Sequence, residues 1–344
     1  MNFYIFNSKY KRNILLFIFI FIIFIFIIDI TLYYLIEKKT TEFRFVDELS
    51  SKSKHMLLNG KDKDVVFIGS SRTFYQIDTN YFNLNGLNSY NYGISGRHTP
   101  NYSFMTDNAL KIKPKCIVFG LDAEKLYQPI ERYMDFPTIS DIKQFIESGQ
   151  DIDDVIKAIV KFLKNLHYLN TYDTVIYEKM KILLTKLIPQ KQLGVLSRSN
   201  KKVENNYDCD YFDIAYNRGS HQHETLVKCK NGDGIIYGNA LDKLTGIKSL
   251  ENYDKNHLLL YNSILKKISN NGIKTITIFT PRYQNPFEFK DKEKLISIIK
   301  SDIIIDMTEV SIPMNMWGDN AHLNIFGRTW YSEYIYKKIK NHCR

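Results

Sequence analysis

Short apolar runs recur through most of the chain, and each ends in glycine or small polar residues. Runs of this length and composition are typical of strands buried on both faces of a parallel sheet. Segments with a helical period separate them, so the chain predicts an α/β fold, a three-layer α/β/α sandwich around a central parallel sheet. The expected strands lie at 64–70, 88–96, 115–122, 274–281 and 302–308. The expected helices lie at about 100–112, 255–271, 288–300 and 325–341.

The alternation of strands and helices breaks between 123 and 252. Helical patterns such as DDVIKAIVKFLKNLHYL come first, and polar, aromatic, turn-rich sequence follows. We interpret this stretch as an insertion within one domain that runs from 63 to 344. Because the insertion leaves the sheet at the carboxyl end of the third strand, we expect it beside the ligand site that open α/β sheets carry at that edge.

A long apolar segment precedes the domain. Residues 14–36 would cross about 30 Å of hydrocarbon as a helix and contain one charge, Asp29. A cleaved secretion signal is the alternative, but no small-x-small cleavage site follows. The weak bias of basic residues predicts a cytoplasmic tail at 1–13, a transmembrane helix at 14–36 and a juxtamembrane spacer at 37–62, with the domain outside the cytoplasm. Asp29 either reaches the interface or pairs with a membrane partner.

Composition excludes some classes of protein. Hydrophobic residues make up 44% of the chain, which is enough for a sizeable core and argues against disorder. The net charge of +10 suggests nucleic acid at first sight, but the lysines alternate with acids, and neither an arginine-rich strip nor a base-stacking motif appears. We interpret the positive net charge instead as a weak, general attraction to an anionic membrane surface or glycan. His221, His223 and Glu224 lack a further ligand nearby, so we expect no metal, and we expect no cofactor.

The four cysteines have no C-x-x-C spacing, so neither a zinc site nor a thioredoxin-like site is predicted. Cys209 and Cys229 could form a disulfide in an oxidising compartment, with free thiols as the alternative. Cys116 lies inside an expected strand and is predicted to be a plain core residue.

Polar stretches at the ends of expected strands and in the last loop carry the candidate chemistry. They are FIGSSR at 67–72, NYGISG at 91–96 and GDNAHLN at 318–324. A serine nucleophile needs a base within hydrogen-bond reach, and the base needs an orienting group. Ser71, His322 and Asp319 fit these roles, since one turn of chain can bring an acid and a histidine three residues apart to the same side. Ser70 is the alternative nucleophile, and Asn324 is available to cap the final helix.

This arrangement resembles the SGNH or GDSL hydrolase superfamily. Its first block reads G-D-S, which aligns Ser71 with the family nucleophile. NYGISG is similar to the family's N-x-G-x-S-G, and Gly96 matches the glycine whose backbone N–H helps to form the oxyanion hole. Asp319, His322 and Leu323 match the D-x-x-H-L block. The matches cover about 64–122 and 255–341, and they imply a flavodoxin-like SGNH-hydrolase fold outside the membrane anchor and the insertion.

One position differs from the family pattern. The third block usually reads G-x-N-D, with an Asn that donates to the oxyanion, whereas Asp122 stands there in this chain. An ionised carboxylate about 4 Å from an oxyanion would oppose it by about 4 kcal/mol at an effective dielectric near 20. Asp122 is therefore protonated, or orients another group, or belongs to a shifted loop. The resemblance places Ser71, Gly96 and Asp122 in the oxyanion region. Arg72, Arg97 and His98 are candidates for the substrate cleft, and for Arg97 and His98, which follow the second block, simple placement on the surface is the alternative.

Two groups related to this superfamily combine one amino-terminal span with an extracytoplasmic SGNH-like domain: the D-alanyl transfer proteins of teichoic acid modification and the alginate-type polysaccharide O-acetylation proteins. The resemblance implies a membrane-anchored serine acyltransferase or acylesterase that modifies a cell-envelope polysaccharide, with acetyl as the expected group. Expected partners are the glycan, an acyl donor, the membrane and a membrane-bound O-acyltransferase. The expected location is the bacterial cytoplasmic membrane, with the domain in the periplasm or at the cell surface. The alternatives are a carbohydrate or lipid esterase or deacetylase, and a non-catalytic glycan-binding scaffold.

Overall fold

The computed structural model describes the folded domain and short pieces of the insertion. The described residues are isolated positions between 13 and 27, then 48–134, 136, 138–165, 209–212, 216–218, 221–223, 226–229, 232–236, 238–239, 241–243 and 246–344.

A five-stranded parallel sheet forms the centre of the domain, in the order β12-β10-β3-β1-β2. All five strands expected from the apolar runs are present. If these five strands are numbered one to five along the chain, their order across the sheet from β2 to β12 is 2-1-3-4-5. In this arrangement the strand order reverses between β1 and β3, which is where open α/β sheets bind their ligands. The strand bounds are β1 Val65–Gly69, β2 Ser89–Gly93, β3 Cys116–Leu121, β10 Lys274–Phe279 and β12 Ile303–Asp306.

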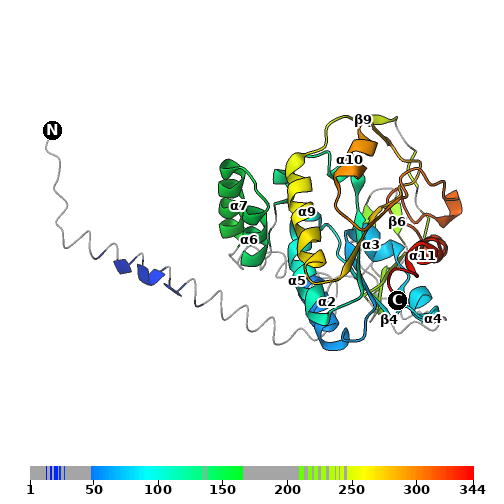
Figure 1. The fold of residues 1–344 in the computed structure, drawn as a ribbon, viewed down its shortest axis with the longest axis horizontal. Helices are drawn as coiled ribbons and strands as arrows, with labels where there is room; N and C mark the ends of the chain where they lie inside the picture. Colours follow the sequence, from blue (N-terminus) through cyan, green and yellow to red (C-terminus); the bar gives the residue numbers. More distant parts are fainter. Residues whose placement is uncertain are drawn as a thin grey trace, which may run out of the picture.

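Helices cover both faces of the sheet (Figure 1). Alternate side chains of each strand point to opposite faces. In β1, Val66 and Ile68 join the core beneath one group of helices, while Val65 and Phe67 join the core beneath the other. The first group comprises α2 (Glu48–Asn59), α5 (Tyr102–Ile112) and α9 (Lys255–Ser269), with α10 (Lys292–Ile298) at its edge. The second comprises α4 (Thr79–Leu84) and α11 (Ile325–Ile339).

Helix α2 falls within the stretch expected to be a spacer, yet its Met56 is fully buried in the core. Lys52 is buried as well and donates a hydrogen bond to the carbonyl of Asn91 at 3.3 Å. The packed part of the domain therefore includes residues before 63. Most of residues 14–36 lie outside the described part, and within that part no helix combines the length and apolarity needed to cross a bilayer.

The insertion contributes helices and small strands around the sheet. Helix α6 (Ile139–Glu147) packs against α5, α9 and α7 (Ile152–Asn165). Two 3-10 turns, η3 (Ala123–Lys125) and η4 (Ile130–Tyr133), connect β3 to α6. The small strands are β4 Cys209–Phe212, β5 Tyr216–Arg218, β6 His221–His223, β7 Leu226–Cys229, β8 Gly234–Ile236 and β9 Lys248–Leu250, and β9 pairs with β11 Phe287–Phe289.

A disulfide joins Cys116, the first residue of β3, to Cys343, which follows α11. The prediction that Cys116 is a plain core residue is wrong. Because α11 packs on the sheet face and ends beside the start of β3, the two cysteines meet although 227 positions separate them. The predicted partners Cys209 and Cys229 lie opposite each other in the β4–β7 ladder, but their side chains lie outside the described part of the chain.

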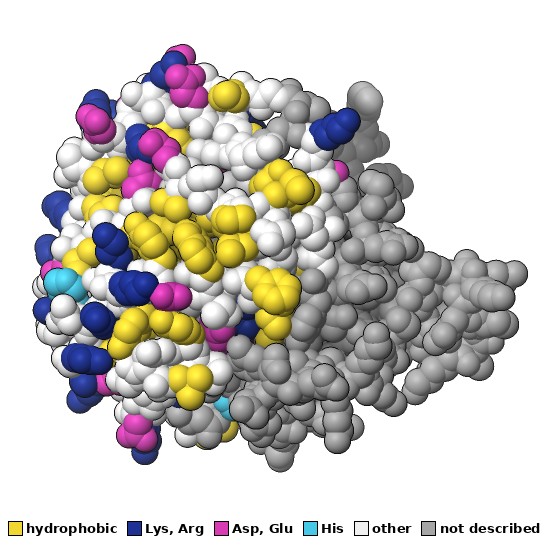
Figure 2. Space-filling model, turned by 90° about the vertical axis from the view of Figure 1, so that its right-hand side faces the viewer, with side chains coloured by type: hydrophobic (Ala, Val, Ile, Leu, Met, Phe, Trp, Pro, Cys, Tyr) yellow, Lys and Arg dark blue, Asp and Glu magenta, His cyan; other side chains and the backbone are white. Residues whose placement is uncertain are grey.

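Apolar side chains also reach the surface on the side of the molecule that carries α4 and α11. Figure 2 shows this face, where they lie in groups between charged side chains. Leu84 on α4 and Phe326 on α11 are exposed.

Candidate active site

Three glycines lie side by side at the carboxyl ends of β2, β1 and β3, because Gly69 is in register with both Gly93 and Gly120. At these positions the sheet presents only backbone to the short helix α3 (Ser71–Gln76). A Cβ on Gly69 or Gly120 would lie 1.9 or 2.1 Å from the Thr73 hydroxyl, and one on Gly93 would lie 2.4 Å from the α3 backbone. The glycines therefore let α3 sit directly on the strand ends.

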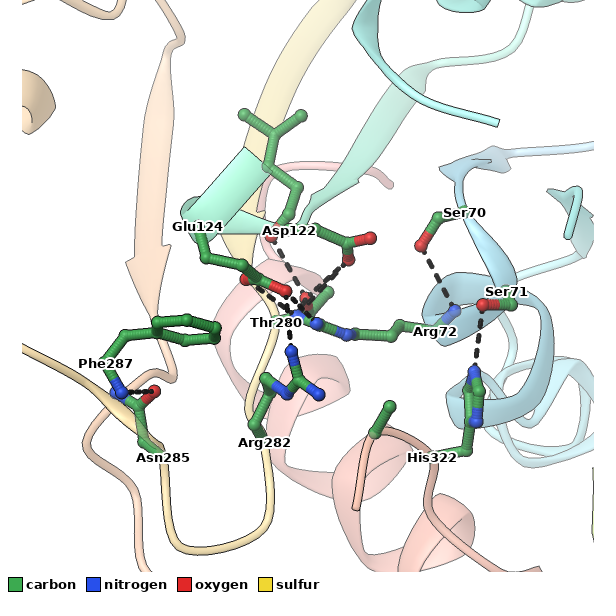
Figure 3. Close-up of polar contacts among 12 residues, drawn as sticks. Ser70, Ser71, Arg72, Asp122, Glu124, Thr280, Arg282, Asn285, Phe287 and His322 are labelled. Carbon is green, nitrogen blue, oxygen red and sulfur yellow. Dashed lines mark hydrogen bonds and ion pairs between the residues drawn. The ribbon is translucent and has the colours of Figure 1, made fainter. Parts of the chain in front are cut away.

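The two adjacent serines at the start of α3 have different contacts. Ser70 is the N-cap, and its hydroxyl accepts a hydrogen bond from the backbone N–H of Arg72 at 3.2 Å. The Ser71 Oγ instead lies 2.9 Å from the Nε2 of His322 (Figure 3). Of the two candidate nucleophiles, Ser71 is the one that contacts the histidine.

A tight loop before α11 brings Asp319 and His322 together. The backbone N–H of Gly318 donates to the carbonyl of His322 at 2.8 Å. One carboxylate oxygen of Asp319, Oδ1, accepts from the backbone N–H groups of Ala321 and His322 at 2.7 and 2.8 Å. The other, Oδ2, accepts from the ring Nδ1 of His322 at 2.8 Å. Asn324 then caps α11, as predicted, by accepting from two backbone N–H groups.

Ser71, His322 and Asp319 thus form one chain of hydrogen bonds. Burial by itself would raise the pKa of the Asp319 carboxyl, but the adjacent imidazole and the two backbone N–H groups hold it well below its usual range. Asp319 is therefore ionised at neutral pH. An ionised carboxylate can only accept, so Nδ1 is the nitrogen that carries a proton, and in the neutral ring Nε2 is the nitrogen that can accept the Ser71 hydroxyl proton.

Neighbouring side chains hold the loop at 318–322, called the histidine loop below, in place. The Gln76 amide at the end of α3 donates to the carbonyl of Ala321 at 3.1 Å. The Tyr75 ring meets the His322 ring edge to face, with centroids 5.1 Å apart. A Cβ on Gly318 would lie 2.6 Å from Ile236 of the insertion. The insertion therefore lies against the loop, as expected from where it leaves the sheet.

A network of charged side chains lies next to Ser71 (Figure 3). Arg72 is buried, and both of its terminal nitrogens donate to the Glu124 carboxylate. Arg72 also lies 3.5 Å from Asp122 and donates to the Thr280 hydroxyl at 3.2 Å. Burial opposes ionisation of Glu124, but Arg72 and Arg282 lower its pKa to about 2. Glu124 is therefore ionised at neutral pH.

Asp122 belongs to this network. Its Oδ1 accepts from the Thr280 hydroxyl at 3.1 Å, and its Oδ2 lies 3.9 Å from the Nδ1 of His98. Of the alternatives for Asp122, these contacts favour the one in which its carboxylate orients other groups. An acceptor held in this way does not supply the donor that the family's Asn provides. Burial lowers the pKa of His98 to about 4, although Asp122 acts in the opposite direction, so the ring is neutral at pH 7.

Two backbone N–H groups are available to act as oxyanion donors. Gly96 is exposed and adopts a φ of 72°, a left-handed conformation that glycine accepts without strain. Among the described residues, the N–H groups of Ser71 and Gly96 have no hydrogen-bond partner. The N–H of Ile94 donates to the carbonyl of Gly69 at 2.9 Å, and this bond holds the carboxyl ends of β1 and β2 together. Arg97 is half-buried in the same loop.

Sequence reasoning did not select Glu124, Thr280 or Arg282. Each lies within three residues of the carboxyl end of a central strand, and this position alone could have marked the residue as a candidate for the site. No motif marks them, since the contacts of Glu124 and Thr280 with Arg72, and of Arg282 with Glu124, appear only when β3 and β10 pair. Within the described residues no group of three or more His, Cys, Asp or Glu side chains could hold a metal ion. The side chains of His221, His223 and Glu224 lie outside that part.

No model of a known protein family matches this sequence. No curated protein is similar enough to match it either.

Proposed function

We propose that this protein is a membrane-anchored serine acyltransferase or acylesterase that modifies a cell-envelope polysaccharide, with an SGNH-type domain and acetyl as the expected group. One observation carries the proposal: the Ser71 hydroxyl, the His322 imidazole and the Asp319 carboxylate form a continuous hydrogen-bonded chain at the carboxyl edge of a parallel sheet. Resemblance of the sequence blocks to the SGNH superfamily supplies the class of substrate.

In the first half-reaction the Ser71 oxygen attacks the carbonyl carbon of the acyl donor while His322 Nε2 takes the hydroxyl proton. The negative charge that develops on the carbonyl oxygen is stabilised by the backbone N–H groups of Ser71 and Gly96. Asp319 stabilises the imidazolium. The bond to the leaving group then breaks, and the leaving oxygen takes the proton from His322, which leaves the acyl group as an ester on Ser71.

In the second half-reaction an incoming hydroxyl gives its proton to His322 and attacks the Ser71 ester. Collapse of the tetrahedral intermediate returns the proton to the serine oxygen. If the hydroxyl belongs to a sugar, the product is an O-acylated glycan, and if it belongs to water, the product is a free acid. The His322 side chain is 18% exposed, so either hydroxyl can reach it, and hydrolysis by an esterase or deacetylase is the second candidate function.

Location outside the cytoplasm is part of the proposal, with residues 14–36 as the transmembrane span. The Cys116–Cys343 disulfide supports it, because structural disulfides persist in oxidising compartments and are rare in the reducing cytoplasm. A membrane anchor would hold the domain near an acyl-exporting partner such as a membrane-bound O-acyltransferase.

Labelling with a fluorophosphonate probe tests the nucleophile. We expect the full-length protein to be labelled, Ser71→Ala to lose the label and the neighbouring variant Ser70→Ala to keep it. Absence of label on folded wild-type protein would favour the non-catalytic scaffold. Mass spectrometry of an acyl donor incubated with glycan then separates transfer from hydrolysis, and release to water alone would favour the esterase.

A further inference from the structure

A pocket of about 380 Å³ opens beside the candidate active site. Its walls come from the loops after β10 and β12, at the same edge of the sheet as Ser71. Its volume falls in the range of small-molecule sites, roughly 300–1,000 Å³. The lining residues on the β10 side are Arg282, Tyr283, Gln284 and Asn285. On the other side they are Thr308, Glu309, Val310, Ser311, Ile312 and Trp317.

The pocket is continuous with the histidine loop. Trp317 is two residues before Asp319, and the backbone N–H of Tyr283 donates to the carbonyl of Asn320 at 3.3 Å. The Tyr283 ring is half-buried and meets Trp317 at a centroid distance of 6.0 Å. A ligand held in this pocket would therefore lie next to the loop that positions His322.

Arg282 connects the pocket to the charged network beside Ser71. Its Nη1 donates to Glu124 at 3.1 Å, and its guanidinium lies 5.4 Å from the centre of the Phe287 ring. Its Nε is buried and has no hydrogen-bond partner among the described residues. Buried donors are almost always paired, so this one calls for an acceptor that the described part of the protein does not provide.

The geometry of the guanidinium indicates which acceptor would fit. With Nη1 bound to Glu124, the Nε and Nη2 edge remains, and this edge matches the two oxygens of a carboxylate or phosphate. The acid in the wall, Glu309, does not oppose such an anion strongly, because Lys292 pairs with it and with Asp306.

The loop that forms one wall is held in an unusual conformation. Gln284 has a φ of 45°, in the left-handed region that residues with a side chain rarely adopt. The Asn285 side chain stabilises the turn by accepting from the backbone N–H of Phe287 at 3.3 Å. Such conformations are retained at binding and active sites, where they pre-organise the contacts to a ligand.

We propose that this pocket is a subsite for an acidic sugar unit of the substrate, with its carboxylate or phosphate on the Nε and Nη2 edge of Arg282 and its ring against Tyr283. The identity of the ligand as a sugar rests on the proposed function. Arg282 is then a specificity-determining residue rather than a part of the hydrogen-bonded chain through Ser71.

Binding to the full-length Ser71→Ala protein tests the subsite without turnover. Isothermal titration with glucose, glucuronate, glucose 6-phosphate and inorganic phosphate separates the ring from the anion and the carboxylate from the phosphate. We expect at least one of the two acidic sugars to bind about tenfold or more tightly than glucose, as expected for a charge-assisted bidentate pair. Adding Arg282→Gln should abolish this preference, and adding Arg132→Gln, an exposed arginine on η4, should preserve it.

Equal binding of all three sugars, or a preference that survives Arg282→Gln, would overturn the proposal. Inorganic phosphate binding as tightly as glucose 6-phosphate would overturn the part of the proposal that concerns the sugar ring. Arg282→Lys keeps the positive charge near Glu124 but lacks the Nε donor, so a preference that it leaves intact would also count against the subsite, even if Arg282→Gln does not fold. Fluorophosphonate labelling tests the Ser71 nucleophile independently of ligand binding, so failure of the proposed function is distinguishable from failure of the proposed subsite.

Discussion

Replacing Asp319 by Asn isolates the contribution of one charge to the proposed reaction. The backbone N–H groups of Ala321 and His322 both donate to Oδ1, so they should hold the amide oxygen of the new Asn at this position. The amide nitrogen then takes the place of Oδ2 and donates to Nδ1 of His322. The ring must carry its proton on Nε2, and Nε2 can no longer accept the proton of Ser71.

The structure also sets a magnitude. A carboxylate 2.8 Å from the ring nitrogen of the imidazolium contributes at most about 6 kcal/mol at an effective dielectric of 20. Each 1.36 kcal/mol corresponds to a factor of about ten in rate, so the upper limit is roughly four powers of ten. Both side chains are about one-fifth exposed, which weakens the interaction, and we expect kcat to fall by about 10³–10⁴ with little change in KM.

Hydrolysis of p-nitrophenyl acetate by the full-length protein measures the effect, and Asp153→Asn on α7, an exposed aspartate, serves as the matched control. Thermal unfolding checks that the variant is folded. A fall of less than tenfold in folded Asp319→Asn, or an equal fall in the control, would refute the role assigned to this carboxylate.

Three further predictions concern other parts of the domain. Cys343→Ser should destabilise the protein by up to roughly 5 kcal/mol in urea unfolding, because the disulfide closes a loop spanning 227 positions; an unchanged midpoint would mean that the bond does not form. The depressed pKa of Glu124, about 2 when folded, means that its stabilisation is complete above the unfolded pKa of about 4.3 and is lost as pH falls toward 2. The free energy of unfolding of the wild type should therefore fall more than that of Glu124→Gln over this pH interval. Parallel plots of unfolding free energy against pH for the two proteins would contradict the ion pairs of Glu124 with Arg72 and Arg282. Asp122→Asn should change turnover less than about tenfold, since the carboxylate is held by Arg72 and Thr280; a hundredfold gain would show that the native charge opposes the oxyanion.

The sequence predicted the central sheet well, because the buried strands are short runs with glycine at or next to their ends in β1, β2 and β3 and with small polar residues shortly after β10 and β12. The contact between Ser71 and His322 was also predicted, since both positions follow from the rule that loops at the carboxyl ends of parallel strands converge. Helices α3 and α4 were not predicted, because six residues are too few to show a helical period.

The disulfide and the charged network could not be obtained from spacing alone. Cys116 looks like any small apolar residue of a buried strand, and its partner is brought to it only by the packing of α11 on the sheet. Glu124 and Arg282 resemble ordinary loop charges until the neighbouring strands β3 and β10 bring Glu124 into contact with both Arg72 and Arg282. Pairings of this kind depend on tertiary contacts between segments that are far apart in sequence.

The row of glycines under α3 has a consequence for how this site could change during evolution. Since the strands carry no side chains at these three positions, α3 rests on the backbone of the sheet, and the position of Ser71 depends on that backbone rather than on replaceable side chains of the strands. Mutations in the surrounding loops could therefore alter which molecules enter the site while Ser71, the proposed nucleophile, stays in the same place.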